Sequence, residues 1–187
     1  MSKNEKKTNT NISNRDLPIS TDIGQFLTEV NNVPIFVDIN SFRATGALYK
    51  ALDFNSLQTI SISITQTWYI VPLLTAGESL NATLDASAGT ITVGLDGYYN
   101  MSGFVTWRVT SATARCKLGI GIAGSTPTAA NQIGGQDLDA ALYNTTGFST
   151  HIRLTAGQST AIYVWNDQGT QNIQIAGLHF NIVKIAN

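Results

Sequence analysis

Cysteine is almost absent from this sequence, since Cys116 is the only one in 187 residues. A single thiol cannot form a disulfide within the chain, so the fold has to be stable without covalent cross-links. Cys116 stands among apolar residues of an alternating segment, which favours a buried, inert thiol. The lack of a disulfide framework is more typical of a protein made in the cytoplasm than of a small secreted scaffold.

Charge is also scarce. Asp, Glu, Lys and Arg make up 12% of the residues, about half of the ~25% found in average soluble domains. The formal net charge is −1, so no overall field draws the protein to nucleic acid or to an acidic membrane. We therefore expect neither as a partner. Lys3, Lys6 and Lys7 form a small basic cluster, which either lies in solvent or touches an acidic surface.

Long apolar runs are missing. No segment is long enough to span a bilayer, and the first residues contain no apolar core of a signal peptide. We therefore expect synthesis in the cytoplasm of a host cell and no membrane anchor.

Signals for catalysis or metal binding are few. The chain has two histidines, His151 and His179, and no phosphate loop, zinc-ligand spacing or nucleophile elbow. Asp137 and Asp139 either help to hold Ca²⁺ in a loop or lie in solvent, and the other ligands of a calcium loop are missing. The sequence predicts a protein that is not an enzyme and needs no metal or cofactor. A hydrolase on a β-scaffold is an alternative without an identifiable triad.

Residues 1–57 are predicted to form an N-terminal arm with one short helix. Residues 1–19 are polar and cannot offset the entropy of ordering, which indicates an extended arm. Apolar residues then recur at the spacing of one helical face. They are Ile23, Phe26, Leu27 and Val30. A helix of about nine residues is marginal alone, so we expect this anchor helix to dock on its own head, on another copy or on another protein.

Residues 58–187 are predicted to form an all-β head. From Ile60 onward apolar and polar residues alternate with a period of two, and turn signals separate about nine strands. This pattern indicates an antiparallel jelly-roll sandwich. Residues 123–142 are expected to form a long loop with at most one short strand, and Gly177 is expected to mark a β-bulge.

Three segments of the head resemble the C1q/TNF-like jelly-roll family, including its members on bacteriophage and virion fibres and its decoration proteins. They are residues 91–102 (ITVGLDGYYNMS), 152–162 (IRLTAGQSTAI) and 177–182 (GLHFNI). The chain departs from the family at Gln158, where an Asp is common. It also lacks a collagen-like run, and residues 1–57 have no counterpart.

The resemblance implies a homotrimer packed around a threefold axis through aromatic side chains. The segment 161–165 (AIYVW) supports this, because a strand that is apolar on both faces is buried on both sides. The interface candidates are Tyr99, Phe104, Tyr163 and Trp165. Alternatively, the polar ends of these side chains face water at the ends of the sandwich.

Two functions fit this architecture. The first is a structural virion protein, a trimeric capsid-decorating or fibre protein that the N-terminal arm anchors to capsid or tail proteins. The second is a fibre-tip module that binds a host receptor or glycan, with its site in the loops around residues 123–144. Trp68, Trp107 and Trp165 would stack on sugars if exposed, and otherwise pack in the core.

Overall fold

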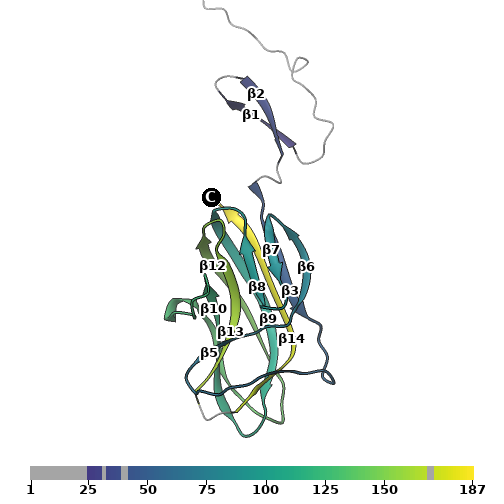
Figure 1. The fold of residues 1–187 in the computed structure, drawn as a ribbon, viewed down its shortest axis with the longest axis vertical. Helices are drawn as coiled ribbons and strands as arrows, with labels where there is room; N and C mark the ends of the chain where they lie inside the picture. The colour runs from purple at the N-terminus through teal and green to yellow at the C-terminus, as the bar shows by residue number, and fades with distance from the viewer. Residues whose placement is uncertain (1–24, 31–32, 39–41, 168–170) are drawn as a thin grey trace, which may run out of the picture. The chain divides into compact units, whose positions relative to one another are not determined.

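The structure is a computed structural model that describes residues 25–30, 33–38, 42–167 and 171–187 (Figure 1). The chain divides into two compact units, residues 1–39 and residues 40–187. The expected boundary lay after Leu57. The second unit begins earlier because β3 (Thr45–Lys50) pairs with the C-terminal strand and is therefore part of the head.

The first unit contains a β-hairpin where the anchor helix was expected. Strand β1 (Gln25–Val30) pairs antiparallel with β2 (Val33–Asp38), and Val30 lies opposite Val33. The helix prediction for Phe26, Leu27 and Val30 is therefore wrong, and Ile23 lies outside the described residues. A strand forms here in place of a helix because a second segment rich in Val, Ile and Phe follows two residues later. Pairing between the two strands stabilises both segments.

The second unit is a sandwich of two antiparallel sheets (Figure 1). The sheet that we call the β14 sheet has the order β12-β9-β14-β3-β6, with β4 also paired to β14. Its strands are β4 (Gln58–Ile60), β6 (Thr75–Leu80), β9 (Gly97–Val109), β12 (Asn144–Leu154) and β14 (Ile173–Ala186), together with β3.

The other sheet, which we call the β13 sheet, has the order β11-β10-β13-β8-β7, with β5 also paired to β13. Its strands are β5 (Trp68–Ile70), β7 (Ala82–Asp85), β8 (Thr90–Val93), β10 (Ala114–Ile122), β11 (Gln132–Leu138) and β13 (Ser159–Asn166). Strand β11 lies in the segment expected to be mainly loop, after the short 3-10 turn η2 (Ala129–Asn131). No helix in the described part of the chain is long and apolar enough to cross a membrane.

The core lies between the two sheets and follows the period of two. Every second residue of β9 points inward, and β14 continues the layer beside it. The largest fully buried side chains include Trp107, Tyr99, Phe180 and Leu48. Met101 and Trp107 belong to the inward face of β9.

A β-bulge adjusts β14 to β9. The pairing register shifts between Ile175 and Gly177, as the change of phase in the sequence predicted. A Cβ atom on Gly177 would lie 3.0 Å from Cδ1 of Leu52, so a side chain at this position would push the segment that follows β3 away. The bulge brings Ile173, Ile175 and Leu178 onto the same inward face.

Candidate functional site

Tyr99 belongs to the core of the head and not to an outer surface. Its side chain is fully buried, and its hydroxyl donates a 2.7 Å hydrogen bond to the carbonyl oxygen of Leu95. Burial, and secondarily the charge of Asp96, raises the pKa of the Tyr99 hydroxyl. A side chain in this position cannot contact a second copy, so its assignment to the interface is corrected.

Tyr163 lies on the outward face of the β13 sheet and is covered by its own chain. Only 9% of the residue is exposed. It is paired with Ile70 of β5, and its ring lies directly over Gly121, where any Cβ atom would collide with it. The expectation that another copy must cover this apolar face is therefore wrong for Tyr163, because Gly121 and the turn after β10 lie against its ring and Ile70 lies beside it in the sheet.

Trp165 lies two residues further along the same outward face and is partly exposed. The ammonium group of Lys117 lies 4.1 Å from the centre of its ring, and the ring of Trp68 lies 6.3 Å away at an angle of 42°. These contacts are local to the β13 sheet, so Trp165 does not share a surface with Phe104.

Phe104 lies on the outward face of the β14 sheet. The residue is 37% exposed, and its ring stacks against His179, with 6.2 Å between the ring centres and an angle of 14° between the planes. His179 is in turn paired with Tyr49 on β3, which is 36% exposed. We call Phe104, His179 and Tyr49 the aromatic row, because the three lie on neighbouring strands in one register. Sequence analysis missed Tyr49, which lies on a strand that was assigned to the arm.

The positions beside the aromatic row are small and uncharged. The next register on the outward face consists of Ser149, Ser102, Asn181 and Ala47, on β12, β9, β14 and β3 respectively. At the outward positions of these four described strands, the sequence contains no Asp or Glu. The face is therefore an aromatic strip within a polar surface that lacks carboxylates and carries Arg153 near one end of β9 and Arg108 near the other.

Arg108, the cation at one end of this face, already contacts Tyr143, Gln174 and Ala140 of its own chain. The guanidinium of Arg108 lies 4.6 Å from the centre of the Tyr143 ring, and its Nε donates a 2.9 Å hydrogen bond to Oε1 of Gln174. Its Nη1 donates to the carbonyl oxygen of Ala140 at 3.2 Å. The edge of Phe54 packs against Tyr143, with 4.8 Å between the ring centres.

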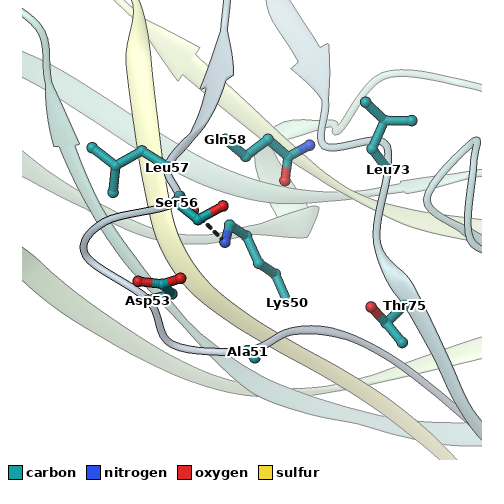
Figure 2. A pocket seen from close by; sticks show the side chains of 8 residues that line it. All are labelled: Lys50, Ala51, Asp53, Ser56, Leu57, Gln58, Leu73 and Thr75. Carbon is teal, nitrogen blue, oxygen red and sulfur yellow. Dashed lines mark hydrogen bonds between the residues drawn. The ribbon is translucent and has the colours of Figure 1, made fainter.

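A pocket of about 490 Å³ lies between the segment after β3 and the segment before β6 (Figure 2). Figure 2 shows Lys50 reaching toward Ser56, whose carbonyl oxygen accepts a 2.7 Å hydrogen bond from the Lys50 ammonium. Nε2 of Gln58 donates to the carbonyl oxygen of Pro72. These two hydrogen bonds hold the loop in place.

The groups with catalytic or metal-binding chemistry are dispersed. Burial, followed by the charges of Asp167 and Asp137, raises the pKa of the Cys116 thiol to about 12. Oδ1 of Asp137 lies 3.7 Å from Nε of Arg115, and Asp139 accepts a hydrogen bond from the amide of Ala141. Among the described residues, no group of three or more His, Cys, Asp or Glu could hold a metal ion.

Comparison with known proteins identifies the fold. No family model matches the chain, and no curated protein matches its sequence. The globular domain of the zebrafish complement 1qA protein superposes with a TM-score of 0.51 at 10% identity, over 78% of this chain and 99% of that one. This likeness confirms the predicted C1q/TNF-like jelly roll, and at this identity it concerns the fold alone.

Two further solved structures are similar at lower scores. Murine APRIL at pH 5.0 gives a TM-score of 0.49 at 12% identity, over 76% of this chain and 99% of that one. The Eiger TNF of S. frugiperda gives 0.47 at 17% identity, over 77% of this chain and 94% of that one.

Proposed function

We propose that this protein is a non-enzymatic structural head that associates as a homotrimer through the outward face of the β14 sheet. The observation that carries the proposal is the aromatic row, because Phe104 and Tyr49 expose large apolar surfaces on adjacent parts of one sheet. Burying such surface is favourable by roughly 25 cal/mol per Å². Aromatic side chains in the centre of an interface are also the residues that most often dominate its energy.

The polarity of the surrounding positions supports association on this face. Ser102, Asn181 and Ala47 are small, so the sheet of one copy can approach another closely. Removing charged groups from water costs far more than removing neutral polar groups that find new hydrogen bonds. The outward positions of these strands carry no carboxylate, and the two guanidinium groups already have contacts within the chain, Arg108 with Gln174 and Arg153 with the Tyr98 ring, which lowers the cost of desolvating this face.

The number of copies in the assembly follows from the resemblance of three sequence segments to the C1q/TNF-like family, which implies a threefold axis. Closed rings of identical subunits are common among soluble oligomers. A ring also gives each copy the same environment, so one aromatic row per chain suffices. The proposed assembly therefore buries three aromatic rows around one axis.

The proposed place of this head is a virion, where it decorates a capsid or forms part of a fibre. Three features support this: the separate N-terminal unit of residues 1–39, the low charge of the chain and the absence of disulfides. In this proposal the N-terminal unit binds a capsid or tail protein, and the head projects from the particle. Polar N-terminal segments that order on binding are a common means of such attachment.

The substitution Phe104→Asp tests the association surface. A charge in the centre of the buried face should convert the trimer to a monomer while the far-ultraviolet circular dichroism stays unchanged, because Phe104 points away from the core. Ile64→Asp is the matched control, since Ile64 is 63% exposed and lies in the loop between β4 and β5. Sedimentation velocity of the two variants measures the effect, and equal sedimentation of both would contradict the proposal.

A further inference from the structure

The outward face of the β13 sheet carries a cluster of aromatic and charged side chains on four adjacent strands. Trp68 on β5, Trp165 on β13 and Lys117 on β10 lie in one register. Arg115 and Asp137 face each other across β10 and β11 two residues further along. We call these five residues the tryptophan cluster.

A shallow pocket of about 340 Å³ lies beside Lys117, whose ammonium group lies over the Trp165 ring. Arg115, Lys117 and Asp137 line it together with Gly135 and Gln136. Gly135 lies opposite Lys117 and has no side chain, which leaves the space above β11 open. This volume is near the lower end of the range for small-molecule pockets, and it suits a single ring-sized ligand.

The polar groups of the pocket are available to a ligand. The side chains of Arg115 and Asp137 are 63% and 65% exposed, and the distance of 3.7 Å between Nε and Oδ1 exceeds that of a hydrogen bond. An exposed ion pair of this kind is weak and exchanges readily with other partners. Lys117 contributes three further donors, and its present contact is with the Trp165 ring.

We propose that the tryptophan cluster binds a neutral hexose unit of a glycan. The C–H faces of a hexose ring are apolar and pack against an indole ring, which Trp165 supplies beside Lys117 at the edge of the pocket. Its hydroxyl groups donate to the carboxylate of Asp137 and accept from Arg115 and Lys117, so both kinds of hydrogen bond are provided.

The charges within the cluster favour a neutral ligand over an acidic one. Two cations line the pocket, and two carboxylates lie close to them, Asp137 within the lining and Asp167 just after β13. The amide of Asp167 donates to the carbonyl oxygen of Arg115 at 3.1 Å, which fixes this residue beside the cluster. The local charge therefore sums to about zero, and no net attraction selects uronic acids or sulfated sugars.

The site lies on the sheet opposite to the proposed association surface. Binding by one copy therefore needs no residue of another, and the inference goes beyond the assembly role. If three copies do assemble, each presents one site, and a ligand with several hexose units gains avidity.

The test uses the full chain and neutral oligosaccharides of glucose, galactose and mannose, with oligogalacturonate as the acidic comparison. Saturation-transfer NMR detects binding, and tryptophan fluorescence reports it at Trp165 and Trp68. We expect at least one neutral oligosaccharide to bind, and Asp137→Ala and Arg115→Ala to weaken it about tenfold or more. Both side chains are exposed, so neither substitution should disturb the fold.

Two further variants make the result decisive. Gly135→Val adds a branched side chain to the lining of the pocket without removing a polar group, and should abolish binding because it fills the space above β11. Lys50→Ala, in the other pocket, should leave binding unchanged. The proposal is overturned if no neutral oligosaccharide binds, if only the acidic one binds, or if Lys50→Ala has the effect expected of Asp137→Ala. Phe104→Asp should retain the affinity per site, so this test stands apart from that of the trimer.

Discussion

The aromatic residues of this chain have different roles, and the role of each depends on whether its side chain lies on the inward or the outward face of its strand. Tyr99 and Trp107 are separated by an even number of residues, point inward and are fully buried. Phe104 is five residues from Tyr99 on the same strand and therefore points outward. The sequence already contained this information, because residues an odd number apart on a strand lie on opposite faces. Grouping Tyr99 and Phe104 in one interface was inconsistent with that alternation.

The role of Tyr163 could not be derived from its own segment. Its strand is apolar on both faces, which shows that both are covered but does not identify the cover. The cover is the turn after β10, and Ile70 of β5, about ninety residues earlier in the chain, lies beside Tyr163 in the sheet. The alternation of apolar and polar residues along one strand predicts which side chains are buried. Which other segments bury them depends on the topology of the sheet.

Cys116 should be chemically inert in the folded protein. Its pKa of about 12 lies above the ordinary value, so the reactive thiolate is a negligible fraction at pH 8. We expect no reaction with Ellman's reagent in native buffer and one equivalent of thiol after unfolding in guanidinium chloride. Rapid reaction of the native protein at pH 8 would show that the β10 side of the core opens.

At the scale of elements, the hairpin of the first unit shows where a helical pattern misleads. Phe26, Leu27 and Val30 fit a helical face, but they fit a short strand as well. A period of 3.6 and a period of two cannot be distinguished over so few residues. The deciding information was the partner segment Val33–Asp38, which pairs along its whole length. By contrast, the long strands were predictable because β9 sustains the period of two and β14 keeps it on either side of the bulge at Gly177.

The close approach of β9 and β14 depends on Gly103. A Cβ atom there would collide with the carbonyl oxygen of His179 and would lie 2.9 Å from the ring of Phe148. We expect Gly103→Ala to lower the free energy of unfolding by about 1–3 kcal/mol, the usual cost of overpacking, or by more. Urea denaturation followed by tryptophan fluorescence measures this change.

Gly147→Ala is the control for that substitution. Gly147 lies on the neighbouring strand β12 opposite Phe104, on the outward face, and the nearest atom to its Cβ position is the carbonyl oxygen of Gly103, 3.9 Å away. We expect this variant to change the free energy of unfolding by less than ~0.5 kcal/mol, as surface substitutions commonly do. Equal effects of the two variants would contradict the packing argument for Gly103.

At the scale of the whole molecule, the jelly roll was predictable, and the extent of the head was not. The turn signals and alternating segments of residues 58–187 indicated the sandwich, and the C1q-like fold confirms it. The strand β3 was not predicted because apolar and polar residues hardly alternate in its sequence, TGALYK. It becomes a strand through pairing with both β14 and β6, which is a property of the assembled sheet.

Removal of residues 1–39 should separate attachment from assembly. We expect this deletion to leave the head folded and associated, because the association surface lies entirely on the second unit. The deletion should also abolish incorporation into virus particles, measured by immunoblotting of purified virions. A truncated protein that still enters particles would contradict the anchoring role, and one that becomes monomeric would show that the N-terminal unit takes part in assembly.

The solution mass of the full chain, measured by multi-angle light scattering, tests the central claim most directly. The account predicts about three times the 20.0 kDa of one chain, because burial of the aromatic row on the β14 sheet drives three copies together. A mass equal to one chain at micromolar concentration would contradict it, and the outward face of the β14 sheet would then be an ordinary solvent-exposed surface.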